Sequence, residues 1–308
     1  MTVLASCMAL FAHAGEANAV ESVAESMTIA FFMPHLNTPF MNNLGEAVKK
    51  YAEAAGVKLV EYVADNDPSK QVSQIGDAVA LGVDGILLDP SSNEDIAEGV
   101  RGAKAAGIPV VTLHEPVSTQ NECVSFVGPD FTDGGVKQMR QAMADFPRGG
   151  NFAVIYGMMG HSAQINISAG YPIALKGYEN KYKIVFEGEG EWSTESALAL
   201  AAQWFSSGER IDAVICNNDA MAIGALQAAT NAGRAGKVRI YGLDAQDDVL
   251  GAIEEGLIHA TVFTDYETEA RVSIDIIVKV VKGEYINSRY MIPMTLITEK
   301  NVGRFIKK

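Results

Sequence analysis

The stretch DNDPSKQVSQIGDAVALGVDGILLDP, residues 65–90, decides the fold class of this chain. Asp67 can cap a helix and Pro68 suits its first position, so a helix is predicted to begin here. Apolar side chains such as Ile75 and Val79 then recur at helical spacing and face inward. The run DGILLD that follows is apolar without alternation, which is typical of a strand buried on both faces of a parallel sheet. A helix that leads into a buried strand is the unit of an α/β protein.

The same alternation extends outward from this stretch over the whole chain of 308 residues. A helical stripe over residues 38–55 precedes it, where Thr38 can cap the helix, Pro39 suits its first position and Gly56 is predicted to stop it. Ten further short apolar runs are predicted strands: MTIAFFM, VKLVEYV, IPVVTL, CVSFVG, FAVIYG, YKIVFEG, DAVICN, VRIYGLD, HATVFT and MIPMTLI. Because these runs are nearly continuous, they indicate parallel sheets, and the fold class is α/β.

The chain also contains two segments of similar sequence pattern. GVDGILLDPSSNED is followed by a helical pattern and IPVVTLHE, and ERIDAVICNNDAMA is followed by a helical pattern and VRIYGLDA. Asp84 and His114 are 30 positions apart, and Asp212 and Asp244 are 32 positions apart. Two similar β-α-β units at matching spacing predict two similar lobes, although general α/β regularity explains part of the likeness.

Charge and the N-terminal residues bear on location and partners. The formal net charge of −14 argues against nucleic acid and anionic membranes as partners. Residues 1–19 are apolar, rich in Ala and end in small residues, so we expect a signal peptide and a periplasmic location. LASC, residues 4–7, also resembles a lipoprotein box with Cys7 as a lipid anchor. The apolar run continues past Cys7, which favours ordinary cleavage.

Cys123 and Cys216 lie in apolar runs and are interpreted as buried thiols.

Polar residues gather where the predicted strands end. Asp89 closes one strand, His114 and Glu115 follow another, NND at 217–219 follows a third, and Asp244 ends a fourth. In open parallel sheets, ligands bind beyond the carboxyl ends of the strands. The alternative for each residue is a helix cap or a turn, but the set in both halves of the chain favours a shared cleft.

These features together resemble the periplasmic sugar-binding proteins of ABC transporters, of the ribose-binding type, along nearly the whole mature chain. The matching segments are IAFFMPHLNTPFMNNL, DNDPSKQVSQIGDAVALGVDGILLDP, AGIPVVTL, NNDAMAIGAL and GLDAQDDVLGAIEEGLIHATV. The resemblance implies two Rossmann-like lobes with a ligand between them, joined by a hinge of three crossovers. The N-terminal lobe would comprise residues 27–128 plus 266–291, and the C-terminal lobe residues 129–265 plus 292–308. The crossovers would fall near Gly128–Asp130, Thr264–Tyr266 and Arg289–Pro293.

The resemblance also implies which residues hold the ligand. Phe40 would place its ring against one face of a sugar, with Met41 where a second aromatic is common, and Trp192 would oppose it from the other lobe. The alternative is that both rings belong to the core. The full set implied as ligand-binding is Thr38, Phe40, Met41, Asp89, His114, Glu115, Asn166, Trp192, Asn218, Asp244, Thr264 and Asp265.

Several of these positions depart from the family pattern. Glu115 stands where an Arg is usual, and a second expected Arg reads Ile167, with Asn166 beside it. Thr264, followed by Asp265, replaces an expected Gln. A sugar acid would therefore meet carboxylates without a fixed cation. A neutral monosaccharide or sugar alcohol is favoured, with a cationic amino sugar as the alternative. His114, if neutral, can donate to one hydroxyl and accept from another.

The predicted function is capture of a small polyhydroxylated solute by a monomer and its delivery to a membrane permease through hinge closure. No cofactor and no metal are expected. The loaded protein could also address a chemoreceptor. An enzyme is disfavoured because G-x-S-x-G, phosphate-loop, HEXXH and paired CxxC motifs are absent from the sequence. A gene regulator is disfavoured because no basic helix-turn-helix headpiece precedes the first strand.

Overall fold

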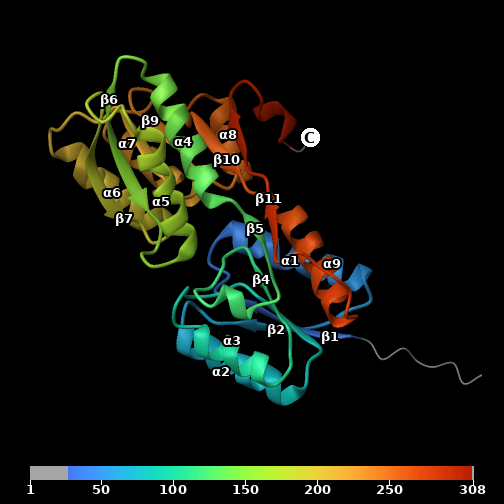
Figure 1. Ribbon diagram of the computed structural model, residues 1–308. Coiled ribbons are helices and arrows are strands. Elements are labelled where there is room, and N and C mark those ends of the chain that lie inside the picture. The colour runs from blue at the N-terminus through green and yellow to red at the C-terminus, as the bar shows by residue number, and fades with distance from the viewer. Residues whose placement is uncertain (1–26, 307–308) are drawn as a thin grey trace, which may run out of the picture.

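The computed structural model describes residues 27–306, so the expected signal peptide, with Cys7, lies outside the described residues. The described chain forms two lobes, each with one six-stranded sheet between helices (Figure 1). The strand orders are β11-β5-β4-β3-β1-β2 and β12-β10-β9-β8-β6-β7. Every described pair of neighbouring strands is parallel except β10 with β12. The predicted α/β fold with parallel sheets is confirmed.

Each lobe is built from elements that are not all contiguous in sequence. The first lobe holds β1 (Thr28–Met33), α1 (Pro39–Ala54), β2 (Lys58–Val63), α2 (Pro68–Leu81), β3 (Gly85–Leu88), α3 (Ala97–Ala105), β4 (Val110–Leu113), β5 (Ser125–Pro129), α9 (Tyr266–Val281) and β11 (Arg289–Ile292). The second lobe holds α4 (Phe131–Asp145), β6 (Gly150–Tyr156), α5 (Ser162–Leu175), β7 (Tyr182–Glu189), α6 (Thr194–Ser206), β8 (Ala213–Cys216), α7 (Asp219–Asn231), β9 (Arg239–Tyr241), α8 (Asp247–Glu254), β10 (Ala260–Phe263) and β12 (Thr295–Thr298). Two short 3-10 helices span Gln120–Glu122 and Val302–Arg304.

The chain crosses between the lobes three times, from β5 to α4, from β10 to α9, and from β11 to β12. The prediction of a single strand in MIPMTLI is wrong. The structure divides this segment into β11 and β12, which belong to different sheets, with Pro293 and Met294 between them. Proline lacks an N–H and has a fixed φ, so it ends the pairing at the point where the chain changes lobes.

Local sequence signals set the helix ends. The Thr38 hydroxyl accepts a hydrogen bond from the Met41 N–H at 3.3 Å, and Pro39 occupies the first turn of α1. Asp67 caps α2 by accepting from the N–H groups of Ser69 and Lys70 at 2.9 and 3.1 Å. Both helix starts therefore follow the cap-and-proline pattern predicted from the sequence.

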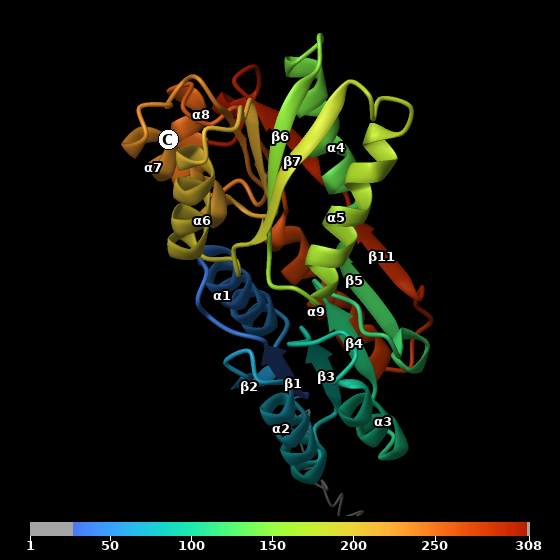
Figure 2. The same cartoon turned by 90° about the vertical axis from the view of Figure 1, so that its left-hand side faces the viewer.

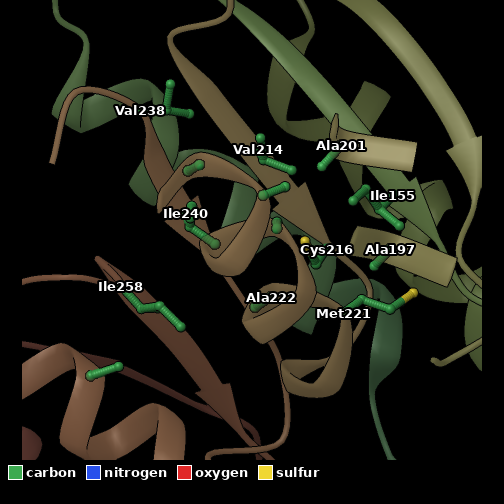
Figure 3. Packing of buried hydrophobic residues seen from close by; sticks show 14 of the residues in the cluster. Ile155, Ala197, Ala201, Val214, Cys216, Met221, Ala222, Val238, Ile240 and Ile258 are labelled. Atoms are coloured by element: carbon green, nitrogen blue, oxygen red, sulfur yellow. The ribbon is translucent and has the colours of Figure 1, made fainter. Parts of the chain in front are cut away.

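Apolar side chains cover both faces of each sheet and form the cores of the lobes. Figure 3 shows part of the second lobe's core, where Val214 and Ile240 from neighbouring strands and Met221 of α7 belong to one buried cluster. Cys216 is buried in this cluster and Cys123 is partly exposed, and both are free thiols. Between residues 27 and 306, no helix has the length and apolar character needed to cross a membrane.

Candidate functional site

A cavity lies between the lobes, beyond the carboxyl ends of strands from both sheets. The empty space among its lining atoms, including open solvent at the mouth, is about 510 Å³. Nine residues implied as ligand-binding line it: Thr38, Phe40, Met41, Asp89, His114, Glu115, Trp192, Asn218 and Asp244. The lining is completed by Pro34, His35, Phe131, His161, Ala163, Ile167, Asn217 and Leu243.

Three residues implied as ligand-binding do not line the cavity. Asn166 and Ile167 are neighbours on α5, and only Ile167 lines the cavity. Neighbouring residues of a helix point in different directions, so the side chain of Asn166 points elsewhere. Thr264 is fully buried at the crossover from β10 to α9. Asp265 caps α9, with its carboxylate accepting from the N–H and hydroxyl of Thr268 at 3.0 and 2.8 Å.

Aromatic rings form the apolar part of the lining. Phe40 is 5% exposed and belongs to the core of the first lobe as well as to the cavity wall. Its ring centroid lies 4.7 Å from that of His114 and 6.1 Å from that of Tyr266. Phe131 meets the His114 ring edge-to-face at 5.1 Å and was not identified from the sequence. Phe40 is therefore both a core residue and a part of the cavity wall.

Trp192 enters the cavity wall from the second lobe on an unusual backbone. Trp192 has a φ of 60° and Glu191 a φ of 53°, which places both in the left-handed region. The indole ring packs on Gly157, where an added Cβ would come within 2.2 Å of ring atoms. A glycine is needed at position 157 because only the absence of a side chain lets the ring lie there.

His114 is the cationic group of the lining. It has a φ of 64°, and its Nδ1 lies 3.0 Å from Oε2 of Glu269, a fully buried residue of α9. Burial alone lowers the pKa of His114, but the negative charge of Glu269 and the hydrogen bond to it outweigh burial and raise the pKa to about 9. His114 is therefore not in the neutral form whose hydrogen bonds the sequence analysis described. At neutral pH the ring carries its proton and both nitrogens donate.

Asp89 is the exceptional polar group of the cavity. It is 1% exposed, and within the described chain neither carboxylate oxygen has a hydrogen-bond partner. Its backbone is held firmly, since its carbonyl oxygen accepts from Nε2 of Gln71 at 2.9 Å and Oε1 of Gln71 accepts from the N–H of Ser91 at 2.8 Å. Burial raises the pKa of Asp89 well above its ordinary value, and the charge of His114 acts in the opposite direction.

Asp244 and its surroundings form the opposite polar wall. Asp244 has a φ of 123°, and its backbone N–H donates to the carbonyl of Val262 at 2.8 Å. Burial, followed by the charge of Asp219, raises the pKa of Asp244 well above its ordinary value. Asp219 itself holds the neighbouring loop by accepting from the hydroxyl of Thr261 at 2.7 Å and the N–H of Gln246 at 2.8 Å.

The pair Asn217 and Asn218 performs two different tasks. Asn218 caps α7, with Oδ1 accepting from the Met221 N–H at 2.9 Å, and its Nδ2 donates to the Trp192 carbonyl at 3.4 Å. Its amide has a second N–H available for a ligand. Asn217 accepts from the Gly157 N–H at 3.0 Å and donates to the hydroxyl of Tyr171 at 2.8 Å. Its side chain therefore links the loop at Gly157 to α5.

Two histidines of the lining were missed by the sequence analysis. His35 is the first residue of the stretch HLNTPFMNNL and accepts from the Asn37 N–H at 3.1 Å. Burial, followed by the proximity of His161, lowers the pKa of His35 to about 4, so this ring is neutral. His161 belongs to the loop GMMGHSAQ, whose glycines were weak signals. His35 adds a neutral hydrogen-bonding ring to the lining, and His161 adds a further imidazole.

Glu115 faces the other lobe. Its Oε2 accepts from the Ser162 hydroxyl at 2.5 Å and from the Ala163 N–H at 3.1 Å, both at the start of α5. Three carboxyl groups, those of Asp89, Asp244 and Glu115, thus line the cavity beside one cationic imidazole. Within residues 27–306, no three His, Cys, Asp or Glu side chains are grouped closely enough to hold a metal ion.

Comparisons with known proteins agree with this architecture. Residues 29–285 match the family model described as a periplasmic binding protein domain. A Rhizobium meliloti protein named as a candidate rhizopine-binding protein is 34% identical, over 93% of this chain and 94% of its own length. A xylitol-binding protein of Mycolicibacterium smegmatis is 33% identical, over 85% of this chain and 75% of its own length.

A solved structure extends the likeness to three dimensions. An ABC transporter solute-binding protein of Bacillus halodurans, solved with bound myo-inositol, superposes with a TM-score of 0.87 at 28% identity. The superposition covers 91% of this chain and 97% of the other. With two lobes, three crossovers and a polar cavity between them, the chain belongs to the family of periplasmic binding protein domains.

Proposed function

We propose that this protein captures a neutral monosaccharide or sugar alcohol between its lobes and delivers it to an ABC permease. The observation that carries the proposal is the carboxyl group of Asp89, buried at the cavity wall with no hydrogen-bond partner for either oxygen among residues 27–306. A buried polar group without a partner is costly, and a ligand hydroxyl would relieve that cost. A polyol can supply several such hydroxyls at once.

The remaining groups suit the same ligand class. Asp244 can accept from hydroxyls, protonated His114 can donate to a hydroxyl oxygen, and the free N–H of Asn218 can donate to another. Phe40 and Trp192 offer ring surface from opposite lobes to the C–H groups of the ligand. A hydroxyl both donates and accepts, so one polyol can satisfy this mixed set.

Charge argues against an anionic ligand. An acid sugar would face the three carboxyl groups of the lining, while the imidazolium of His114 is already paired with Glu269. The relatives support the assignment, because one is named for xylitol and one was solved with myo-inositol, both uncharged polyols. Binding would draw the lobes together about the three crossovers, and the proposed role includes no bond-breaking step.

Location and assembly follow from the same proposal. The protein would be exported after cleavage of residues 1–19 and would act as a monomer. N-terminal sequencing of exported protein tests the cleavage, and a full-length cytoplasmic protein would contradict export.

A thermal-shift screen tests the ligand class. The screen would include pentoses, hexoses, linear polyols, inositols, amino sugars and sugar acids, each followed by calorimetric titration. A ligand that binds only the folded form at one hundred times its Kd stabilises it by about 2.7 kcal/mol. We expect at least one neutral polyol to raise the melting temperature. Stabilisation by sugar acids alone would refute the assignment, and Asp89→Asn, which halves the acceptor capacity, should weaken the response.

A further inference from the structure

One polar residue of the cavity wall makes its hydrogen bonds to the opposite lobe. Glu115 follows β4 in the first lobe and is 8% exposed. Its Oε2 accepts from the hydroxyl of Ser162 at 2.5 Å and from the N–H of Ala163 at 3.1 Å. Figure 2 shows the lower end of α5 reaching down to the tips of β4 and β5, where these contacts form. The contact links the lobes directly, outside the three crossovers.

The helix that receives Glu115 has no cap of its own. His161 occupies the N-cap position of α5 but makes no side-chain cap hydrogen bond. The other long helices of the second lobe differ, because Asp130, Ser193 and Asn218 each cap the helix that they precede. The first N–H groups of a helix need acceptors, and a carboxylate there also interacts favourably with the helix dipole. The first lobe therefore supplies the cap that the second lobe omits.

This arrangement couples helix capping to closure of the cleft. If the lobes separate, the hydrogen bonds between the Glu115 carboxylate and the start of α5 break, and water must hydrate both sides. When the lobes close, these charge-assisted hydrogen bonds form again. The backbone carbonyl of Pro116 adds a longer contact to the Ser162 hydroxyl at 3.4 Å. Ala163, which receives the cap, also lines the cavity, so the contact sits at the edge of the binding space.

We propose that Glu115 is a latch between the lobes, which holds α5 over the cavity and sets how readily the cleft closes. It is a positioning residue, and its acidic side chain acts on the opposite lobe. The proposal rests on the capture function proposed above, since a latch has meaning only for a cleft that opens. It predicts that Glu115 slows opening more than it contributes direct ligand contact.

The test begins with the ligand-free protein and needs no ligand. Hydrogen exchange at the Ala163 amide is compared between wild type and Glu115→Ala, with Asp67→Asn as the matched control. Asp67 is also a carboxylate that caps a helix, but α2 lies in its own lobe. We expect exchange at Ala163 to rise about tenfold in Glu115→Ala and to stay unchanged in Asp67→Asn. Unchanged exchange in Glu115→Ala overturns the latch.

A second measurement separates a latch from a simple cap. Small-angle scattering reports the radius of gyration of the ligand-free variants, and calorimetry with xylitol and myo-inositol reports affinity. A latch predicts a larger radius, an affinity lowered by up to about tenfold, or both, in Glu115→Ala but not in Asp67→Asn. Faster exchange with radius and affinity unchanged overturns it. Glu115→Gln keeps the shape without the charge and should show a smaller change in the same direction.

Failure of the latch and failure of the proposed function are distinguishable. If no polyol binds the wild type, the proposed function fails, while exchange and scattering still decide whether Glu115 joins the lobes. Ser162→Ala provides an independent check, because it removes one donor without touching the carboxylate. Its effect should be smaller when Glu115 is already Ala, and effects that simply add would contradict a direct contact between the two.

Discussion

Replacing Glu269 with Gln tests the electrostatic centre of the cavity. Glu269 is the fully buried partner of His114, at 3.0 Å, and raises the pKa of that imidazole from 6.5 to about 9. A pKa raised by this amount corresponds to about 3 kcal/mol of preference for the protonated ring. Burial raises the pKa of Glu269, so the cost of dehydrating its carboxylate offsets part of this gain. We expect Glu269→Gln to lower the free energy of unfolding by about 2–3 kcal/mol at pH 6.

The sign of the pH dependence follows from the direction of the shift. A group whose pKa is raised on folding contributes stability that is complete below its unfolded pKa and is lost as pH rises through the folded value. For His114 that window runs from 6.5 to about 9. The difference between wild type and Glu269→Gln should therefore be largest at pH 6 and shrink toward pH 9.5.

Urea denaturation at pH 6, 7.5 and 9.5 measures this difference directly. The matched control is Asp275→Asn, on the same helix, which breaks the exposed Lys279–Asp275 pair. That change should have little effect on stability and no dependence on pH across this range. If Glu269→Gln lost the same stability at pH 6 and pH 9.5, His114 would not be a charged partner of Glu269 and the reasoning would be refuted.

The other predictions concern the cavity wall. Trp192→Ala should weaken binding of the best polyol from the screen by about 1–3 kcal/mol in calorimetry, from the lost ring surface, with a small change in melting temperature. Phe40→Ala should weaken binding similarly and also lower stability by about 3–5 kcal/mol, because Phe40 belongs to the core as well; unchanged stability would contradict its core role. Gly157→Ala should reduce affinity by displacing the Trp192 ring, visible as a change in tryptophan fluorescence, and an unaltered spectrum would argue against that packing.

Sequence patterns predicted the elements whose signals are local. Continuous apolar runs marked the parallel strands, and the caps at Thr38 and Asp67 marked helix starts, because each signal acts over a few residues. The segment MIPMTLI misled for the same reason. Its apolar composition indicates a strand, but the division at Pro293 depends on which sheet each half joins, and that is a property of the folded chain.

The candidate site was less accessible to sequence reasoning. Residues at strand ends, such as Asp89 and Asp244, could be found because the fold brings strand ends together. Glu269 could not, since it lies 155 positions after His114, in the first turn of α9, and meets His114 only after the second crossover returns the chain to the first lobe. Its pairing raises the pKa of that histidine, which local sequence could not show. Glu115 was found, but its partner across the cleft was not.

The split first lobe has a consequence for folding during synthesis. Its strands β1 to β5 are complete by residue 129, but α9, which covers one face of their sheet with Ala270, Ile274 and Ile277, ends only at Val281. Once β10 is made at Phe263, the second lobe lacks its edge strand β12 and the short 3-10 helix Val302–Arg304. A chain that is made from its N-terminus therefore contains most of the second lobe before α9 is available to cover the sheet of the first lobe. The second lobe can thus complete most of its fold before the first lobe does, although the first lobe begins earlier in the sequence.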